Sequence, residues 1–140
     1  MRLLTIDNVS MHFSGLKAIV DLSFSIDQGE IRGLIGPNGA GKTTSFYMVV
    51  GMIRPDGGRI ILDGEDITGL PMYQRSRKGI GYLAQEASVF RELSVEDNIS
   101  AVLEFKPLTK SERQARVDRL VEELGLERVR KSKGYVLSGG

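Results

Sequence analysis

One short stretch of the chain combines glycines, a lysine and two threonines at a fixed spacing. Residues 36–44 read Gly-Pro-Asn-Gly-Ala-Gly-Lys-Thr-Thr, which fills every fixed position of the pattern GxxxxGK[ST]. Glycines let the backbone bend until successive N–H groups converge on one small volume. Lys42 adds an ammonium and Thr43 a hydroxyl. Converging donors of this kind bind phosphate groups, so the stretch predicts a loop for a nucleoside triphosphate such as ATP.

The pattern also predicts a part for each residue of this loop. We expect Lys42 to reach the β- and γ-phosphates in the catalysed step, Thr43 to ligate Mg²⁺, and Thr44 to meet the α-phosphate. The remaining nucleotide-binding positions of the loop are Gly36, Pro37, Asn38, Gly39, Ala40 and Gly41. The alternative is a glycine-rich turn with an exposed lysine, which the flanking elements argue against. Residues 30–35 are mostly apolar and suit a buried strand, and residues 45–50 can form a helix that Gly51 ends.

Composition restricts the classes of protein to which the chain can belong. Nineteen basic and 18 acidic residues leave a net charge of +1, which argues against a protein that coats nucleic acid or a membrane surface. The absence of cysteine excludes disulfides and cysteine–zinc sites and fits a cytosolic setting. No apolar run reaches the roughly 20 residues that a membrane-spanning helix needs. We therefore expect any membrane role to depend on a partner.

The first part of the chain has the patterning of strands. Val9, Met11 and Phe13 alternate with polar residues, as do residues 22, 24 and 26, and both runs predict half-buried antiparallel strands. Further along we expect a turn at 55–58, a strand at 59–62, a turn at 63–64, a short basic helix at 71–78 and a strand at 79–83. The basic residues of that helix, Arg75, Arg77 and Lys78, are interpreted as a solvated face, and His12 as a strand-surface residue.

From Glu86 onward the period changes to that of helices. Ser94 with Asp97 predicts a cap for a helix that runs to about Phe105, and Thr109 with Glu112 predicts a capping box for a second helix. One face of the second helix carries predicted core residues, which are Val117, Leu120, Val121 and Leu124. We expect a β-rich, nucleotide-facing portion over residues 1–85 and a helical portion over 86–140.

Two more motifs indicate a family. Residues 82–86, Tyr-Leu-Ala-Gln-Glu, resemble the glutamine loop of ATP-binding-cassette (ABC) ATPases, and residues 137–140, Leu-Ser-Gly-Gly, resemble their signature motif. The order of phosphate loop, glutamine loop and signature is typical of the family, and the resemblance covers the whole chain. It implies an α/β fold of the P-loop NTPase class, with an antiparallel β subdomain, a partial parallel core sheet and a helical subdomain.

The resemblance also implies roles for single residues. Phe13 would stack on adenine, and the alternative for it is an ordinary core aromatic on a strand. Gln85 would touch Mg²⁺ and the attacking water, which makes it a metal-site and catalytic candidate. Ser138, Gly139 and Gly140 would contact the nucleotide held by a second copy, because the family closes as a head-to-tail homodimer.

A finer similarity concerns residues 45–51 and 79–91, which look like those of the ATP-binding subunits of lipopolysaccharide exporters. Ala84 departs from the proline that is usual there, which should change the stiffness of the loop more than its chemistry. By this similarity Phe90 and Arg91 would lie in the groove that receives a coupling helix of an integral membrane permease subunit, the alternative being an exposed aromatic beside a surface charge. The protein would then be cytoplasmic and peripheral on the inner face of the cell membrane.

Other interpretations remain open at this point. The chain could belong to a branched-chain amino-acid importer, although residues 86–91 argue against it, or to a non-transport cassette that acts on DNA or ribosomes. No apolar strand ending in Asp-Glu follows the signature, so the metal-holding aspartate, the water-polarising glutamate and the switch histidine of the family are absent from these residues. We therefore expect the 140 residues alone not to hydrolyse ATP, either as the first part of a longer ATPase or as a non-catalytic remnant.

Overall fold

The structure is a computed structural model that describes residues 1–86 and 88–137. These residues fall into two compact units, Met1–Leu83 and Ala84–Gly140, and each unit is described by itself. Among the described residues no helix has both the length and the apolar composition needed to cross a membrane.

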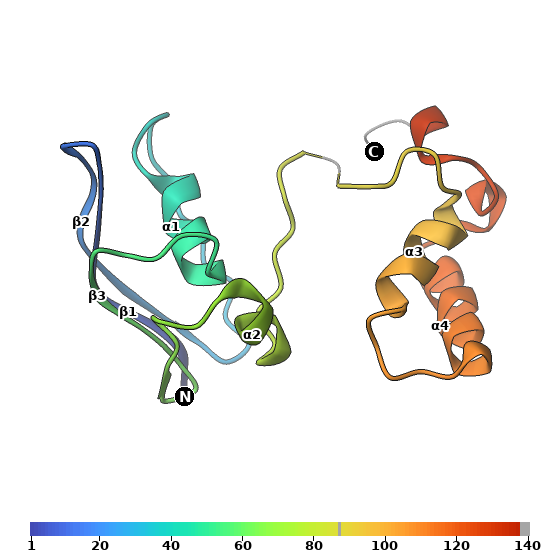
Figure 1. Cartoon of the computed structure of the whole chain (residues 1–140), viewed down its shortest axis with the longest axis horizontal. Coiled ribbons are helices and arrows are strands. Elements are labelled where there is room, and N and C mark those ends of the chain that lie inside the picture. Colours follow the sequence, from blue (N-terminus) through green and yellow to red (C-terminus); the bar gives the residue numbers. More distant parts are fainter. Residues whose placement is uncertain (87, 138–140) are drawn as a thin grey trace. The chain divides into compact units, whose positions relative to one another are not determined.

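A four-stranded sheet forms one face of the first unit (Figure 1). Strands β1 (Arg2–Phe13) and β2 (Leu16–Asp27) make a long hairpin, and β3 (Gly57–Leu62) and β4 (Glu65–Asp66) make a short one. The spatial order is β2-β1-β3-β4, and every neighbouring pair is antiparallel. The alternating patterns at residues 9–13 and 22–26 therefore predicted β1 and β2 and their antiparallel direction correctly. The strand predicted at 59–62 lies within β3, and β4 was not predicted.

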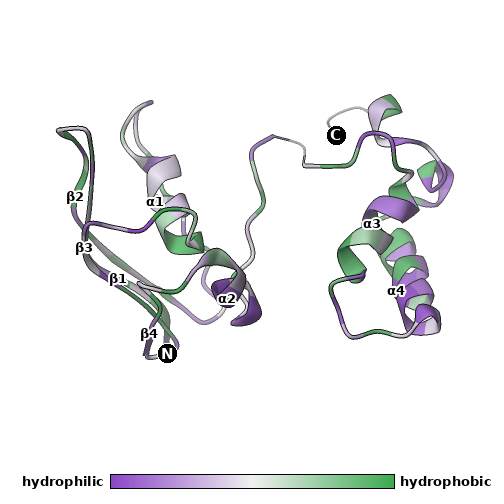
Figure 2. Cartoon of the chain, viewed as in Figure 1, coloured by the Kyte–Doolittle hydropathy of each residue, from purple (hydrophilic) through white to green (hydrophobic). Residues whose placement is uncertain are grey.

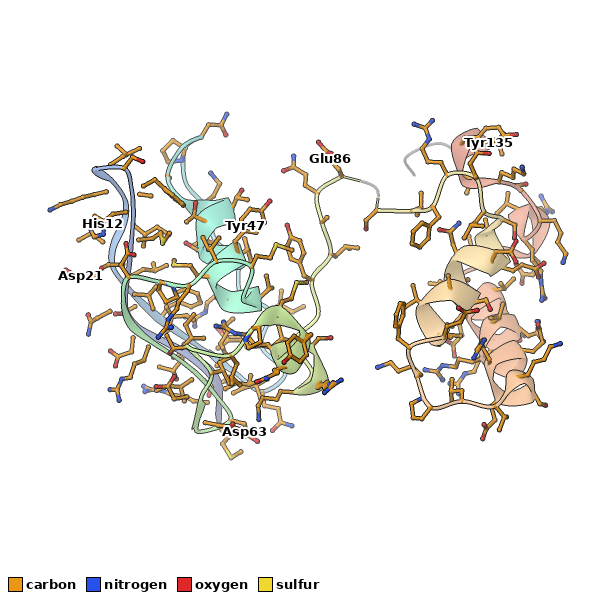
Figure 3. The ribbon with its side chains drawn as sticks, viewed as in Figure 1. His12, Asp21, Tyr47, Asp63, Glu86 and Tyr135 are labelled. Atoms are coloured by element: carbon orange, nitrogen blue, oxygen red, sulfur yellow. The ribbon has the colours of Figure 1, made fainter. Side chains whose placement is uncertain are left out.

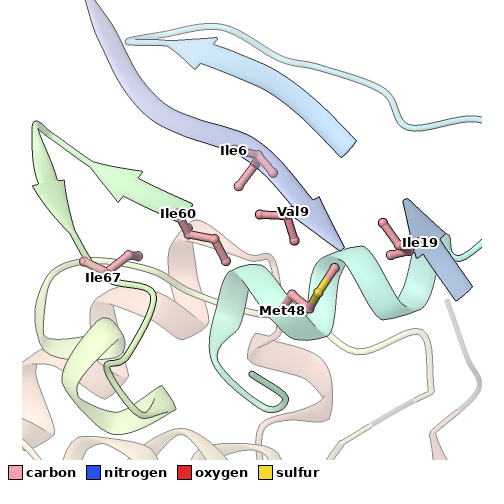
Figure 4. Packing of buried hydrophobic residues seen from close by; sticks show 6 residues of the cluster. All are labelled: Ile6, Val9, Ile19, Met48, Ile60 and Ile67. Atoms are coloured by element: carbon pink, nitrogen blue, oxygen red, sulfur yellow. The ribbon is translucent and has the colours of Figure 1, made fainter. Parts of the chain in front are cut away.

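Helix α1 (Lys42–Val50) covers the sheet through a small apolar core (Figure 4). Ile6 and Val9 of β1 and Ile60 of β3 are almost fully buried, and Met48 of α1 packs against them with 1% of its surface exposed. Burying a side chain of this size stabilises the folded state by about 1.5–3 kcal/mol. The core therefore fixes the helix that follows residues 36–41 onto the sheet.

Two predicted strands are not strands in the structure. Residues 30–35 and 79–83 have no strand assignment, and no parallel pair of strands occurs within residues 1–86 and 88–137. Ile31 is 99% exposed, Ile35 93% and Leu83 90%. The prediction of a partial parallel sheet is therefore wrong for these residues. The physical reason is that a strand needs neighbours for its backbone hydrogen bonds, and no described segment pairs with either run.

The second unit contains two helices, α3 (Val95–Leu103) and α4 (Lys110–Glu123). The Ser94 hydroxyl accepts the Asp97 N–H, and Thr109 forms a complete capping box with Glu112, so both predicted helix starts are confirmed. Helix α3 ends two residues before the predicted end at Phe105. Hydrophilic and hydrophobic residues alternate along α4 (Figure 2), where Val117 and Val121 are buried. Leu124 was wrongly predicted as core, because it is 62% exposed at the helix end.

Short 3₁₀ turns at Glu127–Val129 and Gly134–Val136 complete the second unit. The remaining helix of the first unit is α2 (Met72–Arg77), which is one residue shorter at each end than the helix predicted at 71–78 and has Pro71 at its N-cap position. The mixed α/β character and the antiparallel sheet agree with the predicted fold class.

Candidate functional site

Residues 36–41 form an open loop that leads directly into α1. The Ala40 N–H donates to the Pro37 carbonyl at 3.2 Å, and the Ser45 N–H donates to the Gly41 carbonyl at 2.8 Å, which starts the helix. No acidic residue lies in the first turn of α1. The first N–H groups of a helix have no partner within the helix and carry partial positive charge, so this end of α1 favours an anion.

Gly41 is the residue that brings the loop close to the sheet. Its φ is +82°, and a Cβ atom built on it would lie 2.9 Å from the Ala18 carbonyl oxygen and 2.9 Å from Cγ1 of Ile19. Side chains essentially never make such contacts, so only glycine fits between α1 and β2 at this point. Gly39 also has φ +82° but has no atom within 4 Å of a built Cβ. The glycine spacing of the motif therefore serves both backbone conformation and close packing.

Lys42 lies at the mouth of the loop. Its ammonium donates to the carbonyls of Gly36 and Pro37, each at 2.7 Å. An ammonium has three N–H donors, so these two bonds hold the charge over the loop and leave a donor for an anion. Thr43 is exposed in the first turn of α1, and Thr44 is half-buried beside it. The hydroxyl that the motif predicts as a metal ligand is therefore accessible.

A cavity of about 220 Å³ adjoins the loop. It is lined by β2 through Ala18 and Val20, by Ile35 before the loop, and by Ala40 and Lys42 of the loop itself. Its lining thus mixes apolar side chains with the Lys42 cation and the polar Ser45, so it suits a ligand that has an anionic part.

Phe13 is 45% exposed at the end of β1, outside the buried core. Phe13 is therefore not a core aromatic, which was the alternative interpretation of this residue. It pairs with Leu16 across the turn of the β1–β2 hairpin. That turn and the loop before α1 lie at the same end of the first unit (Figure 1). A half-exposed ring at this end remains a candidate for stacking on a base.

Arg75 corrects the sequence interpretation of the basic helix. It was predicted on a solvated face, but it is 1% exposed and is the largest fully buried side chain among the described residues. Its guanidinium donates to the carbonyls of Met48 and Val49 at 2.7 and 2.9 Å, to Leu70 at 2.8 Å and to Thr68 at 2.9 Å. Arg77 and Lys78 are exposed, as predicted.

Two of these carbonyls belong to the last turn of α1. The last carbonyls of a helix have no partner within the helix and carry partial negative charge, so a buried cation stabilises that end. Desolvation lowers the pKa of Arg75, and the Asp66 carboxylate opposes that shift. Arg75 therefore ties α2 to the far end of the helix whose near end forms the loop. A pattern of charged residues gives no signal for such a role, because buried and solvated arginines look alike in a sequence.

The other predicted site residues lie in the second unit. Gln85 is exposed in a bend at its start, and Phe90 is 61% exposed, with Arg91 exposed beside it. Ser138, Gly139 and Gly140 lie outside the described residues. Within the described residues no group of three His, Cys, Asp or Glu side chains gathers as a metal site.

The donor set of the first unit fits a magnesium-bound polyphosphate. It combines a positive helix end, a glycine-rich loop in which Gly41 has no room for a side chain, an ammonium and an accessible hydroxyl. Mg²⁺ commonly takes one or two protein ligands in addition to phosphate oxygens and water, so a single hydroxyl in this place is compatible with it.

Comparison with known sequences gives consistent relatives. The sequence profile of the ABC transporter family matches residues 19–140. The chain is 50% identical over its full length to the lipopolysaccharide export system ATP-binding protein LptB of Haemophilus influenzae, and equally to that of Escherichia coli K12. It is 57% identical over 120 residues to the LptB of Acidithiobacillus ferridurans. The chain spans 58% of the length of the first two relatives and 50% of the third.

Solved structures with the same fold also come from ABC transporters. A nucleotide-free cassette from an ABC transporter superposes with a TM-score of 0.85 at 26% identity, covering 99% of this chain and 60% of that one. The cbiO1 protein of Clostridium perfringens, part of the ABC transporter complex cbiONQ, gives a TM-score of 0.84 at 27% identity, covering 98% and 56%. The family profile, the LptB relatives and the cassette structures agree with the geometry of the loop, and the chain belongs to the ABC transporter family.

Proposed function

We propose that the chain binds Mg²⁺-ATP through residues 36–44 and is part of the energy-coupling ATPase subunit of a lipopolysaccharide exporter. The observation that carries the binding part is the loop geometry, in which Gly41 lets the positive end of α1 and the Lys42 ammonium face the same space. The 50% identity to LptB proteins supports the choice of cargo.

In this proposal each residue of the loop has a physical task. The loop N–H groups and Lys42 neutralise the phosphate charges, and the Thr43 hydroxyl holds the metal against them. Thr44 contacts the α-phosphate, and the Phe13 ring stacks on the base. When bound, ATP supplies the transferable γ-phosphoryl group. Gln85 orients the attacking water as a hydrogen-bond partner and does not act as a base.

The proposal also includes partners. Two copies would associate head to tail, with Ser138, Gly139 and Gly140 of one copy facing the nucleotide of the other. Phe90 and Arg91 would contact an integral membrane permease subunit, which would place the protein on the inner face of the cell membrane. The exposed Phe90 ring supports this assignment, because aromatic residues and arginine are enriched in protein interfaces.

Replacing Lys42 with alanine tests the nucleotide site. We expect the Lys42→Ala chain to bind Mg²⁺-ATP at least about tenfold more weakly, since a charge-assisted contact to phosphate is lost. Isothermal titration calorimetry with Mg²⁺-ATP measures the affinity. Lys106→Ala is the matched control, because Lys106 is an exposed lysine of the second unit and should leave the affinity unchanged. Equal binding by Lys42→Ala and the unmodified chain would overturn the proposal.

A genetic experiment tests the cargo. The complete gene should restore lipopolysaccharide export in a bacterium depleted of its own LptB, and the Lys42→Ala form should not. Rescue of a branched-chain amino-acid importer mutant instead would show that the cargo is wrong while the nucleotide site stands.

A further inference from the structure

The backbone of Phe90 is held by one side chain of α3. The Oδ1 atom of Asn98 accepts the Phe90 N–H at 2.7 Å, and its Nδ2 atom donates to the Phe90 carbonyl at 3.0 Å. The same amide nitrogen donates to the carbonyls of Ser94 at 2.9 Å and Leu93 at 3.3 Å. A half-buried asparagine thus satisfies both polar groups of Phe90 and folds residues 90–94, here called the docking loop, onto the start of α3.

A second segment of the chain bonds to the other side of the docking loop. The Tyr135 N–H donates to the Arg91 carbonyl and the Gly134 N–H to the Leu93 carbonyl, each at 3.0 Å. Ser94 and Lys133 form an antiparallel bridge. Residues 130–136, here called the lead-in segment, include Tyr135, which is labelled in Figure 3. In the sequence they run directly into the motif at 137–140.

Contacts at the start of α3 continue the connection. The Val95 N–H donates to the Ser132 carbonyl at 3.0 Å and the Glu96 N–H to the Arg130 carbonyl at 3.1 Å. The Arg130 guanidinium returns a bond to the Glu96 carboxylate at 2.5 Å. Backbone hydrogen bonds therefore join the lead-in segment both to the docking loop and to the first residues of α3.

The backbones of the two segments approach each other closely at Gly134. A Cβ atom built on Gly134 would lie 3.1 Å from the Cα of Arg91 and 3.1 Å from the Phe90 carbonyl oxygen. These atoms belong to backbone and cannot rotate away, so a side chain at this position would push the segments apart.

We propose that Asn98 and Gly134 are positioning residues that lock the docking loop and the lead-in segment into one rigid piece. The effect of this rigid piece on transport rests on the proposed function. A permease subunit bound at Phe90 and Arg91 would displace the lead-in segment directly, and with it the start of the signature motif. Asn98 acts by fixing the loop from the α3 side, and Gly134 acts by allowing the backbones to touch.

Single-residue amide hydrogen exchange on the full chain, followed by NMR, tests the rigid piece without nucleotide or partner. In Asn98→Ala we expect protection of the Phe90 amide to fall about tenfold, since a net hydrogen bond is lost. The Gly134 and Tyr135 amides, which Asn98 does not contact, should fall by a similar factor. In Gly134→Ala the Phe90 amide should lose protection in return, because coupling is reciprocal.

Ser94→Ala is the matched control, because it removes only the Ser94 hydroxyl, which bonds Asp97 as the cap of the same helix. The backbone bridge between Ser94 and Lys133 does not need that hydroxyl. It should lower protection at Asp97 and leave Gly134 and Tyr135 unchanged. The proposal is overturned if Asn98→Ala lowers protection at Phe90 but not at Gly134 and Tyr135, and Gly134→Ala leaves protection at Phe90 unchanged. If Asn98→Ala unfolds the unit, Gly134→Ala decides the question alone.

A second measurement concerns the consequence in the complete protein. With the permease subunits in lipid vesicles, Asn98→Ala should lower kcat for ATP about tenfold and leave KM unchanged, since docking no longer reaches the signature. An unchanged kcat would refute the proposal that docking at Phe90 and Arg91 displaces the lead-in segment. A failure of the proposed function gives a different result. The protein without substitutions would then not bind Mg²⁺-ATP, and the permease subunits would not change its ATPase rate, whereas the hydrogen-exchange result would stand.

Discussion

At the scale of residues, the loop at 36–41 depends on the absence of a side chain at Gly41. Its positive φ disfavours any side chain, and the Ala18 carbonyl and Ile19 fill the space in which a Cβ would lie. Gly39 has the same φ and open space around it. The two glycines therefore separate the effect of backbone conformation from the effect of packing.

We predict that Gly41→Ala destabilises the chain more than Gly39→Ala does. A left-handed conformation costs a non-glycine residue about 1–2 kcal/mol, which both variants bear. Only Gly41→Ala adds a clash with backbone, so it should also weaken Mg²⁺-ATP binding by shifting α1. Urea unfolding and calorimetric titration of the two variants measure these effects. Equal losses of stability would mean that the close contact with β2 is unimportant.

At the scale of elements, α1 is held at both ends by different means. Gly41 allows the start of α1 to pack against β2, and Arg75 of α2 donates hydrogen bonds to carbonyls in the last turn of α1. Arg75 also bonds the loop before α2 through Thr68 and Leu70. Helix α2 has only six residues, so it depends on this side chain rather than on its own propensity.

We predict that Arg75→Met lowers the free energy of unfolding by about 3–5 kcal/mol, because buried carbonyls lose charged donors that methionine cannot replace. Arg77→Met on the same helix is the control. Arg77 is exposed and lies over the Tyr73 ring at 5.6 Å, so its loss should cost less than about 1 kcal/mol. Urea denaturation followed by circular dichroism compares them. A small effect at Arg75 would show that water replaces the guanidinium.

At the scale of the whole molecule, both units carry carboxylates that are stabilised in the charged form. Hydrogen bonds lower the pKa of Glu30, Asp56, Asp66, Glu96, Glu112 and Asp118. In the second unit Lys131 first and then Arg130 lower the pKa of Glu96 below the ordinary value of 4.5. Arg130 also bonds Asp118 at 2.6 Å, which joins α3, α4 and the lead-in segment.

We predict that the chain loses stability as the solution is acidified. A carboxyl whose pKa is lower in the folded state contributes stability above its unfolded pKa, and that contribution is lost as pH falls through the folded pKa. The loss of stability should therefore begin at about pH 5 and continue below about pH 4. Urea midpoints across this range measure it. Glu96→Gln should be less stable at neutral pH and show a weaker pH dependence, and an unchanged dependence would contradict the role of Glu96.

Local chemistry made much of the molecule predictable. The GxxxxGK[ST] spacing, the alternation in β1 and β2, and the caps at Ser94 and Thr109 depend on neighbours in the chain, and the structure has these elements where the pattern placed them. The Asp63-Gly64 turn was predictable for the same reason, and both residues have positive φ. For these features the sequence by itself determined the local fold and the phosphate-binding candidate.

Only the tertiary structure decided the rest, because it depends on contacts between segments distant in the chain. Residues 30–35 look like a buried strand, yet no described neighbour pairs with them, and Ile35 is exposed. Arg75 looks like a surface charge, yet carbonyls from α1, 26 and 27 residues away in sequence, surround it. Asn98 bonds both backbone polar groups of Phe90, eight residues away, and no local pattern predicts this. Burial and hydrogen bonding at these positions are set by which segments meet, and a one-dimensional pattern does not contain that information.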